Sequence, residues 1–242
     1  MGYGSPINYK SNMGLIDVKN LERTYPGKVP THALRGVSFS ILEGEFVAIM
    51  GKSGSGKSTL LHQLALLDMP TRGSLTINGE DVLALTEHEK TSFRLTNVGY
   101  VFQEYAALGE LTALENVALP LRVRGGVTCA EAYRQATELL ERVGMGHRLD
   151  HYPSELSGGE QQRVAIARSL INKPRILLAD EPCANLDTIS SETVLKLLSD
   201  LNKKLHQTII MISHEPDDRK WVDRVIWLSD GVIDRIDKVE SI

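Results

Sequence analysis

One stretch of this chain has the residues of a loop that holds phosphate. Residues 51–59 read Gly-Lys-Ser-Gly-Ser-Gly-Lys-Ser-Thr and fit the pattern Gly-x-x-x-x-Gly-Lys-Ser/Thr in full. Glycine lets the backbone curl so that successive N–H groups point at phosphate oxygens, and the lysine and serine add a positive charge and a hydroxyl for Mg²⁺. The residues expected to contact a nucleoside triphosphate and its Mg²⁺ are Gly51, Ser53, Gly54, Ser55, Gly56, Lys57, Ser58 and Thr59.

The sequence on either side of this loop supports the same interpretation. Residues 46–50 are a short apolar run typical of a buried strand, and residues 57–67 have leucines at helical spacing. A strand, a glycine-rich loop and a helix in this order bring the free N–H groups and the positive dipole end of the helix to the phosphates. A glycine-rich turn without a ligand would not need this context.

Three more apolar runs predict buried strands that end in polar or charged residues. Because ligands of an open parallel α/β sheet bind outside the carboxyl ends of its strands, we expect these ends to share one site with the glycine-rich loop. Each end alone would also suit a helix cap or a surface turn. The runs are residues 98–102, which end at Gln103, residues 176–179, which end at Asp180 and Glu181, and residues 208–213, which end at His214.

The chemistry of these side chains suits the hydrolysis of a phosphoanhydride bond. Asp180 follows four apolar residues and is expected to be a partner of the Mg²⁺ held by Ser58, either directly or through a group that ligates the metal. Glu181 is expected to be the general base for the attacking water, and His214 to sense the γ-phosphate and orient that water. Gln103 is expected to ligate Mg²⁺ or the water through its amide. For Glu181 and His214 the alternatives, a helix-start glutamate and a turn histidine, stay open.

A second candidate for phosphate binding lies at the predicted start of another helix. Residues 156–162 read Leu-Ser-Gly-Gly-Glu-Gln-Gln, and Ser157 and Glu160 have the spacing of a capping box. Gly158 and Gly159 leave the helix N-terminus bare, so that a phosphate can approach it. Helix capping and phosphate binding are compatible functions of this turn.

In their order these motifs resemble those of the ATP-binding subunit of an ABC transporter, over roughly residues 15–237. Three further segments, residues 32–38, 99–103 and 111–117, are similar to the branch of lipoprotein-release and macrolide-efflux ATPases, to which a cell-division ATPase also belongs. Residues 51–59 match the Walker A motif, Gln103 the Q-loop, residues 156–161 the signature motif, residues 176–181 the Walker B motif, residues 184–187 the D-loop and His214 the switch histidine.

This resemblance implies ATP and Mg²⁺ as cofactors and a head-to-tail dimer that forms on ATP binding. Ser157, Gly158 and Gly159 would contact the γ-phosphate held by the other subunit, and Asp187 would lie at the same seam. The other subunit would be a second copy or a similar chain. Tyr25 matches the aromatic residue that stacks on adenine in the family, although its alternative is a plain turn residue.

Composition narrows the choice of partners. The 242 residues carry a net charge of −4 without a basic block, which disfavours nucleic acid as a partner. No apolar stretch approaches the length of about 18 residues that suggests a membrane helix. We therefore expect an integral membrane permease on a separate chain, and a cytoplasmic location for this chain, peripheral on the cytoplasmic face of the membrane through that permease.

The predicted function is that of an ATP-hydrolysing motor subunit of an export or lipoprotein-release transporter. Transmission of force without a cargo, as in cell division, is an alternative, and so is a soluble ATP-driven clamp. The segment between the two phosphate motifs lacks sustained heptads, which argues against the long coiled coil of DNA-repair ATPases. Leu108, Leu111 and Leu114, which follow the Q-loop, would be either docking contacts for the permease or core residues.

The pattern of elements predicts an α/β fold with a P-loop NTPase core and a mostly parallel sheet. Residues 15–50 predict antiparallel strands of a β subdomain, and residues 51–103 and 173–237 alternate strands and helices. The segment between them predicts an inserted all-helical subdomain, with a strong helix over residues 130–143. The expected units are a flexible extension at 1–14 and one ATPase domain at 15–242, made of a core at 15–103 and 173–242 and a helical subdomain at 104–172.

Two cysteines do not suggest a disulfide framework. Cys183 follows Glu181 and a proline, where the family commonly has serine or threonine. It is either a small tolerated residue or a redox-sensitive thiol beside the general base. Cys129 lies in a polar helical stretch and is expected to be inert.

Overall fold

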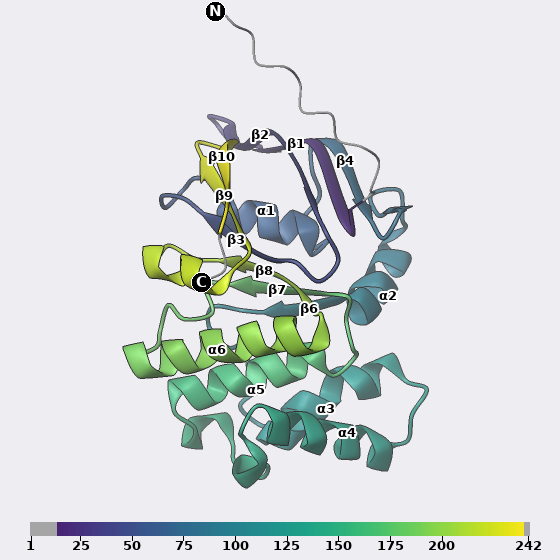
Figure 1. Ribbon diagram of the computed structural model, residues 1–242. Coiled ribbons are helices and arrows are strands. Elements are labelled where there is room, and N and C mark those ends of the chain that lie inside the picture. The colour runs from purple at the N-terminus through teal and green to yellow at the C-terminus, as the bar shows by residue number, and fades with distance from the viewer. Residues whose placement is uncertain (1–13, 240–242) are drawn as a thin grey trace, which may run out of the picture.

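The computed structural model describes residues 14–239, so the extension predicted at 1–14 lies outside the described residues except for Gly14. The chain forms layers in which helix α1 lies between two sheets, and α5 and α6 cover the far face of the larger sheet (Figure 1). Helices α3 and α4 lie beyond α5. The helices are α1 (Lys57–Leu64), α2 (Glu87–Asn97), α3 (Ala113–Arg124), α4 (Cys129–Arg142), α5 (Gly158–Leu170) and α6 (Thr188–Leu205), with short 3₁₀ turns at Gly146–Arg148, Pro153–Glu155 and Pro216–Trp221.

The larger sheet has the order β10-β9-β3-β8-β7-β6, and its strands from β9 to β6 are parallel. Strands β3, β7 and β8 are almost entirely apolar and buried, as strands covered on both faces must be. Because they run in parallel, their carboxyl ends open at one edge of the sheet. The strands are β3 (Phe46–Met50), β6 (Val98–Val101), β7 (Ile176–Asp180), β8 (Thr208–Ile212), β9 (Arg224–Ser229) and β10 (Val232–Lys238).

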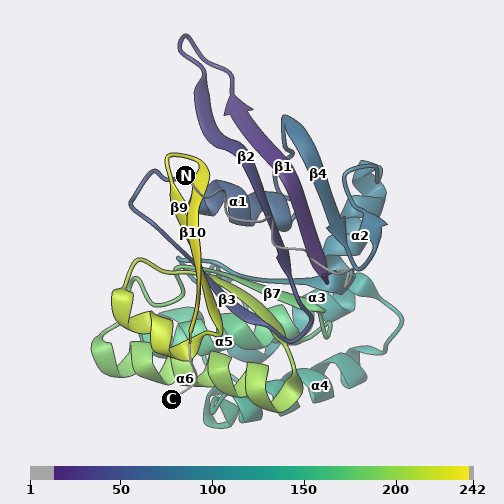
Figure 2. The same cartoon turned by 45° about the horizontal axis from the view of Figure 1, so that its top comes forward.

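The smaller sheet is antiparallel, with the order β2-β1-β4-β5, and it crosses above α1 (Figure 2). Its strands are β1 (Ile16–Tyr25), β2 (Thr31–Ile41), β4 (Arg72–Ile77) and β5 (Glu80–Asp81). The predicted fold class is confirmed, with two corrections. Of the strands expected within residues 15–50, the last is parallel and belongs to the larger sheet, because it is buried on both faces. The segment 72–81, predicted to continue the strand–helix alternation, instead completes the antiparallel sheet.

Helix α1 is shorter than its leucine spacing predicts. It ends at Leu64 rather than Leu67, because Leu66 has a left-handed backbone with φ of 54°. The N–H of Leu67 then donates to the carbonyl of His62, which closes the end of the helix. The chain therefore turns back at this point toward β1.

All regular elements between β6 and β7 are helical, as the sequence predicts for this segment. Threonine or serine caps α3, α4 and α5 through side-chain oxygens that accept from backbone N–H groups, which satisfies donors that the helix leaves free. The predicted helix at 130–143 corresponds to Cys129–Arg142. The domain boundaries at 103/104 and 172/173 stay a prediction.

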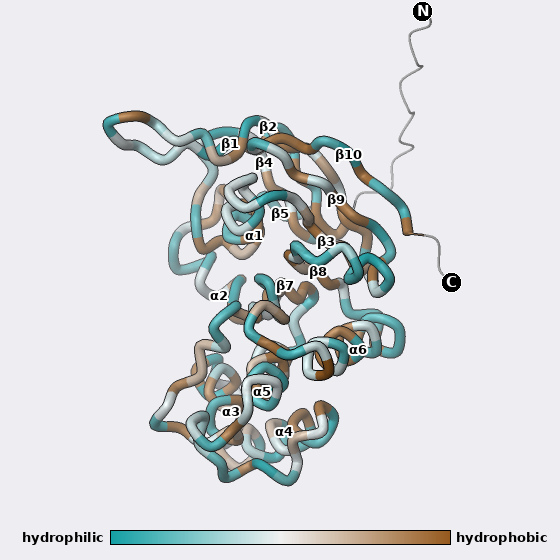
Figure 3. Tube along the Cα trace, turned by 90° about the vertical axis from the view of Figure 1, so that its left-hand side faces the viewer, coloured by the Kyte–Doolittle hydropathy of each residue, from teal (hydrophilic) through white to brown (hydrophobic). Residues whose placement is uncertain are grey.

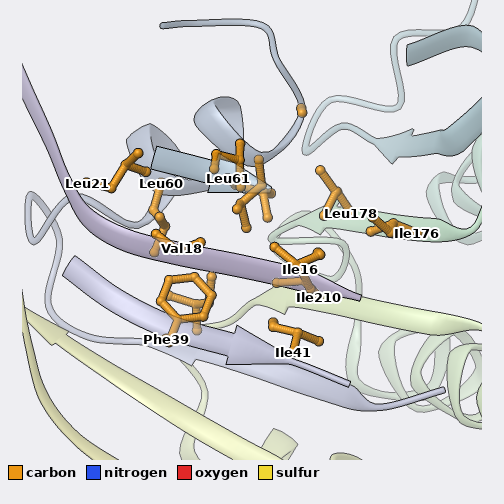
Figure 4. Close-up of a cluster of buried hydrophobic side chains, with 14 of the residues drawn as sticks. Ile16, Val18, Leu21, Phe39, Ile41, Leu60, Leu61, Ile176, Leu178 and Ile210 are labelled. Carbon is orange, nitrogen blue, oxygen red and sulfur yellow. The ribbon is translucent and has the colours of Figure 1, made fainter. Parts of the chain in front are cut away.

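The buried apolar residues form three clusters that match the layers. The first joins the antiparallel sheet, α1 and the upper face of the larger sheet, and Figure 4 shows Phe39 and Leu61 within it. The second fills the space between the larger sheet and α5 and α6, and the third holds the helical layer together. In Figure 3 apolar segments follow β3, β8 and β9 through the middle of the molecule. The larger sheet is therefore held from both faces.

We expect Leu178→Ala, in the middle of β7, to lower the free energy of unfolding by about 2–5 kcal/mol, because it leaves a cavity in a fully buried site. Urea unfolding followed by tryptophan fluorescence measures this change. Val29, which is 82% exposed, supplies the control, since Val29→Ala should change the free energy by less than about 0.5 kcal/mol. Similar values for the two variants would contradict this placement of β7.

Candidate functional site

The glycine-rich loop joins the end of β3 to the start of α1. Gly54 and Gly56 have φ of 76° and 102°, which favours glycine. A Cβ on Gly56 would lie 2.4 Å from the carbonyl oxygen of Ala33, so the loop is also pressed against β2. At Gly54, by contrast, no atom lies within 4 Å of an added Cβ. The loop is thus held against β2 at Gly56 and open to solvent at Gly54, where a ligand has space to enter.

Lys57 adds a positive charge to the polar lining of this loop. Its ammonium group donates to the carbonyl oxygens of Gly51 and Lys52 at 3.0 and 3.1 Å, and its side chain is buried. The hydroxyl of Ser55 is buried and finds no hydrogen-bond partner among the described residues. A buried cation and a free hydroxyl beside the N-terminus of a helix fit a bound polyphosphate. Lys57 lines a pocket of about 740 Å³ with Lys52, Ser53, Glu181, His214, Trp227 and Arg235, among others.

Asp180, the last residue of β7, lies beside the start of α1. Its carboxylate accepts from the hydroxyl of Ser58 at 3.4 Å and from that of Tyr100 at 3.4 Å, both long for a hydrogen bond. Burial raises the pKa of Asp180, and the charge of Glu181 raises it further. A cation between Ser58 and Asp180 would stabilise the charged form of this carboxylate. A hydroxyl and a carboxylate, completed by phosphate oxygens, are the oxygen donors that suit Mg²⁺.

Tyr100 is a residue of this site that the sequence analysis missed. It lies on β6, and its ring packs against Phe102 with centroids 4.5 Å apart. Burial and the charge of Asp180 raise the pKa of Tyr100 well above its ordinary value, so the hydroxyl stays protonated and can donate. Only the pairing of β6 with β7 brings it to Asp180, because the two residues are 80 positions apart. No local motif marks this contact.

Glu181 and His214 come together from the ends of β7 and β8. Nδ1 of His214 lies 3.4 Å from Oε2 of Glu181, and both residues line the pocket that holds Lys57. Glu181 has a left-handed backbone with φ of 43°, which is strained for a residue with a side chain. The pair therefore brings a proton acceptor to the phosphate pocket, with an imidazole against it, and the predicted grouping of Lys57, Ser58, Asp180, Glu181 and His214 is present.

Gln103 is exposed and joins the neighbouring loops through its backbone. Its carbonyl oxygen accepts from Nδ2 of Asn185 at 3.3 Å. Beyond Glu104, Tyr105 and Ala106 have left-handed backbones, and Arg168 of α5 donates to both of their carbonyl oxygens. Gln103 thus lies on a strained turn that α5 and the loop before α6 hold in place.

The turn at 157–159, predicted to bind phosphate, lies outside the pocket lined by Lys57. Ser157 caps α5 and forms the predicted capping box with Glu160: the N–H of Ser157 donates to Oε2 of Glu160 at 2.9 Å, and the N–H of Glu160 donates to Oγ of Ser157 at 3.3 Å. A Cβ on Gly158 would lie 2.8 Å from the hydroxyl of Tyr105, so a larger residue at 158 would push the Tyr105 side chain away from this turn. Ser157 itself is exposed, which leaves the turn open to a ligand from outside the chain.

Comparison with known proteins agrees with this geometry. Residues 34–184 match the family described as ABC transporter. The ATP-binding cassette MJ0796, solved as a dimer in a post-hydrolysis state with ADP and Pi, superimposes with a TM-score of 0.87 at 40% identity, over 94% of this chain and all of that one. The chain belongs to the ABC transporter family.

Two relatives confirm the predicted resemblance to a branch of the family. The lipoprotein-releasing system ATP-binding protein LolD of Shewanella frigidimarina is 41% identical over 93% of this chain and 94% of its own length. The macrolide export ATP-binding/permease protein MacB of Chlorobium luteolum is 48% identical over 90% of this chain but 33% of its own length. The chain spans less than half the length of several curated relatives that it matches. Within residues 14–239, no helix is both long and apolar enough to span a membrane.

In this ABC cassette, the D-loop residue Asp187 has a local role that is plain from its contacts. It caps α6, accepting from the N–H of Ser190 at 2.8 Å and from the Ser190 hydroxyl at 2.9 Å. These hydrogen bonds lower the pKa of Asp187, so it remains charged. Tyr25 ends β1 outside the pocket of Lys57, and its hydroxyl donates to Asp68 at 2.8 Å. The structure therefore does not bring Tyr25, Asp187 and the P-loop into one pocket.

An apolar cleft of about 320 Å³ lies beside the Q-loop of the cassette, between β6, α3 and α5. Phe102 and Leu108, 40% and 45% exposed, both line it. Buried Asn116 fixes Leu108: its amide donates to the Leu108 carbonyl at 3.0 Å and accepts from the Leu108 N–H at 2.8 Å. Leu114 instead packs against the core of the helical layer. The sequence analysis missed Asn116, because its partners depend on how the loop folds.

We expect Cys183 to resist alkylation in the folded cassette. Burial raises the pKa of its thiol to about 12, so at about pH 8 roughly one thiol in ten thousand is ionised and able to react. Exposed Cys129 supplies the internal control. Mass spectrometry after iodoacetamide treatment should find one modified cysteine in the native protein and two in urea. Rapid native modification of Cys183 would revive the redox-sensitive interpretation.

Proposed function

We propose that this chain is an ATP-binding and ATP-hydrolysing subunit of an ABC transporter, and that two subunits close around ATP to drive a membrane permease. One observation carries the proposal. The pocket lined by Lys57 also contains Glu181 and His214, and Ser58, the next residue along the chain, meets Asp180 at 3.4 Å. The turn at 157–159, by contrast, lies outside that pocket and begins with the exposed Ser157. A second subunit would therefore supply the phosphate-binding turn that completes the site.

Within one subunit, the P-loop binds the triphosphate. Lys57 exchanges its two backbone carbonyl partners for the β- and γ-phosphates, and Gly51, Gly54 and Gly56 keep the backbone close enough for its N–H groups to donate. Ser58 and Asp180 would hold Mg²⁺, which would neutralise charge that develops on the phosphates. The other residues assigned to the triphosphate are Ser53, Ser55 and Thr59.

Hydrolysis needs a base beside the γ-phosphate, and Glu181 is the residue placed for that role. Its carboxylate accepts a proton from the attacking water, while His214, 3.4 Å away, holds the carboxylate and the water in line. Gln103 would contribute its amide to Mg²⁺ or to the water. The strain at Glu181 and at the turn after Gln103 suits positions that change with the bound nucleotide.

Ser157, Gly158 and Gly159 of one subunit then bind the γ-phosphate held by the other, and Asp187 lies at the same seam. The dimer of MJ0796 with ADP and Pi supports this arrangement by similarity. Since the ligand binds the closed pair better than the open one, association depends on ATP and reverses after hydrolysis.

The cleft beside the Q-loop is the surface that suits a permease. It exposes Phe102 and Leu108 next to Gln103, so a segment bound there would respond to movement of the Q-loop. We propose that the permease holds the chain at the cytoplasmic face of the membrane. The names of the LolD and MacB relatives favour lipoprotein release or export as the process driven.

We expect Glu181→Gln to retain ATP binding, to lose turnover by about 100-fold or more and to accumulate as a dimer with ATP and Mg²⁺. The amide keeps the shape of the carboxylate but accepts no proton. Size-exclusion chromatography with light scattering, with and without ATP, measures the mass. A variant that binds ATP but stays monomeric would contradict the proposal that two isolated subunits associate around ATP.

A second variant tests the turn at 157–159 independently of the P-loop. In the Glu181→Gln background, Ser157→Arg should block the dimer by placing a bulky side chain over the exposed turn, while ATP binding to the P-loop of the same chain stays unchanged. Isothermal titration with ATP, alongside the light-scattering measurement, tests this. A dimer of normal stability would mean that residues 157–159 lie away from the interface.

Lys57→Ala should weaken ATP binding roughly 10- to 100-fold, because one charge-assisted contact to the phosphates is lost. The same titration measures the affinity. Lys52, which is exposed and also lines the pocket, supplies the control, and Lys52→Ala should have a much smaller effect. Equal losses for the two lysines would indicate general electrostatic attraction rather than a specific role for Lys57.

A further inference from the structure

A carboxylate at the end of α1 gathers four donors from three segments of the chain. Asp68 lies in the turn between α1 and β4. Its Oδ1 lies 2.6 Å from Nη2 of Arg23 and accepts from the N–H of Met69 at 2.9 Å. Its Oδ2 accepts from the hydroxyl of Tyr25 at 2.8 Å and from Nε2 of Gln63 at 3.0 Å. These are short, well-formed contacts, and together they fill the acceptor capacity of the carboxylate.

The same group fixes the ring of Tyr25 in two ways. The hydroxyl anchors the edge of the ring to Asp68, and the guanidinium carbon of Arg23 lies 4.4 Å from the ring centroid, over one face. Arg23 and Asp68 are each only about one-fifth exposed, so this ion pair is better shielded than a surface pair. The cation on the ring adds attraction of its own. One face of a half-buried aromatic ring is covered, and its orientation is set.

The group also ties this ring to the phosphate-binding helix. Gln63 is fully buried on α1, and α1 begins with Lys57 at the P-loop. Asp68 therefore fastens Tyr25, the last residue of β1, to the far end of the helix whose start holds the triphosphate in the proposed function. The residues that follow Tyr25 form an exposed turn, with Val29 at 82% exposure. Without the contact to Asp68, the Tyr25 ring would have no hydrogen bond to hold it at the end of β1, next to a solvent-exposed turn.

We propose that Asp68 and Arg23 are positioning residues for nucleotide binding, which hold the Tyr25 ring as a fixed platform for the adenine base. The base stacks on the ring face opposite Arg23. The inference rests on the proposed function and on the adenine-stacking role that the family resemblance implies for Tyr25. What it adds is the part of Asp68 and Arg23, which neither the motifs nor the P-loop geometry indicate. The benefit is preorganisation: a ring that is already oriented loses no rotational freedom when the base arrives.

Tyr25→Phe tests the anchor while it keeps the ring. In the Glu181→Gln background, isothermal titration should find ATP binding roughly twofold to tenfold weaker, as expected for one lost hydrogen bond. Binding of inorganic tripolyphosphate, which has no base, should be unchanged. Asp68→Asn should act in the same direction. The double variant should bind ATP no more weakly than the weaker-binding single variant, because both changes act through the same contact between the Tyr25 hydroxyl and Asp68.

Tyr133→Phe is the matched control, since its hydroxyl lies on α4 near Arg122, in the helical layer, and it should bind both ligands normally. Equal ATP affinity for Tyr25→Phe and its parent would overturn the proposal. So would a parallel loss of tripolyphosphate binding, because Asp68 would then act through α1 and the P-loop. If Asp68→Asn fails to fold in thermal unfolding, Tyr25→Phe alone decides. Failure of the parent to bind either ligand would instead refute the proposed function.

Discussion

The parallel pairing of β3 with β8, and of β8 with β7, is the constraint on which the rest of the site depends. It brings the carboxyl ends of three buried strands to one edge, where the P-loop, Asp180 and His214 follow. A slip of one residue would turn Asp180 to the opposite face of the sheet, away from Ser58. The register is secured because both faces of these strands are apolar and packed, by α1 on one side and by α5 and α6 on the other. The positions of the charged groups are thus set by the burial of the apolar strand residues that precede them.

Features governed by short stretches of sequence could be predicted. The P-loop, the strands at 46–50 and 176–179 and the capping box of Ser157 follow from local spacing, and the structure reproduces them, with the second strand one residue longer than predicted. The Ser58–Asp180 and Glu181–His214 contacts could be predicted as neighbours, because parallel strands share an edge, but not as distances.

Contacts between distant segments were out of reach of the sequence. The hydroxyl of Tyr100 reaches Asp180 only through the pairing of β6 and β7, and Asp68 meets Arg23 only because the chain turns back after α1. That turn was itself mispredicted: the leucine spacing continues to Leu67, but the left-handed backbone at Leu66 ends the helix early. Side-chain periodicity carries no signal for such a turn. Asn116 is similar, since a buried asparagine is recognised only once the loop around it is known.

The turn after Gln103 links the surfaces on which the proposed function depends. Arg168 holds two left-handed residues of this turn, Asn185 holds the carbonyl of Gln103, and the hydroxyl of Tyr105 lies over Gly158. The apolar cleft, the loop before α6 and the turn at 157–159 therefore all contact the strained segment that contains Tyr105 and Ala106. A change at any of the three would bias the conformation of the others, because packed and strained segments shift between discrete arrangements. Closure of two subunits around ATP and movement of a segment seated in the cleft would then act on the same few residues, which explains how binding energy at one surface can do work at another.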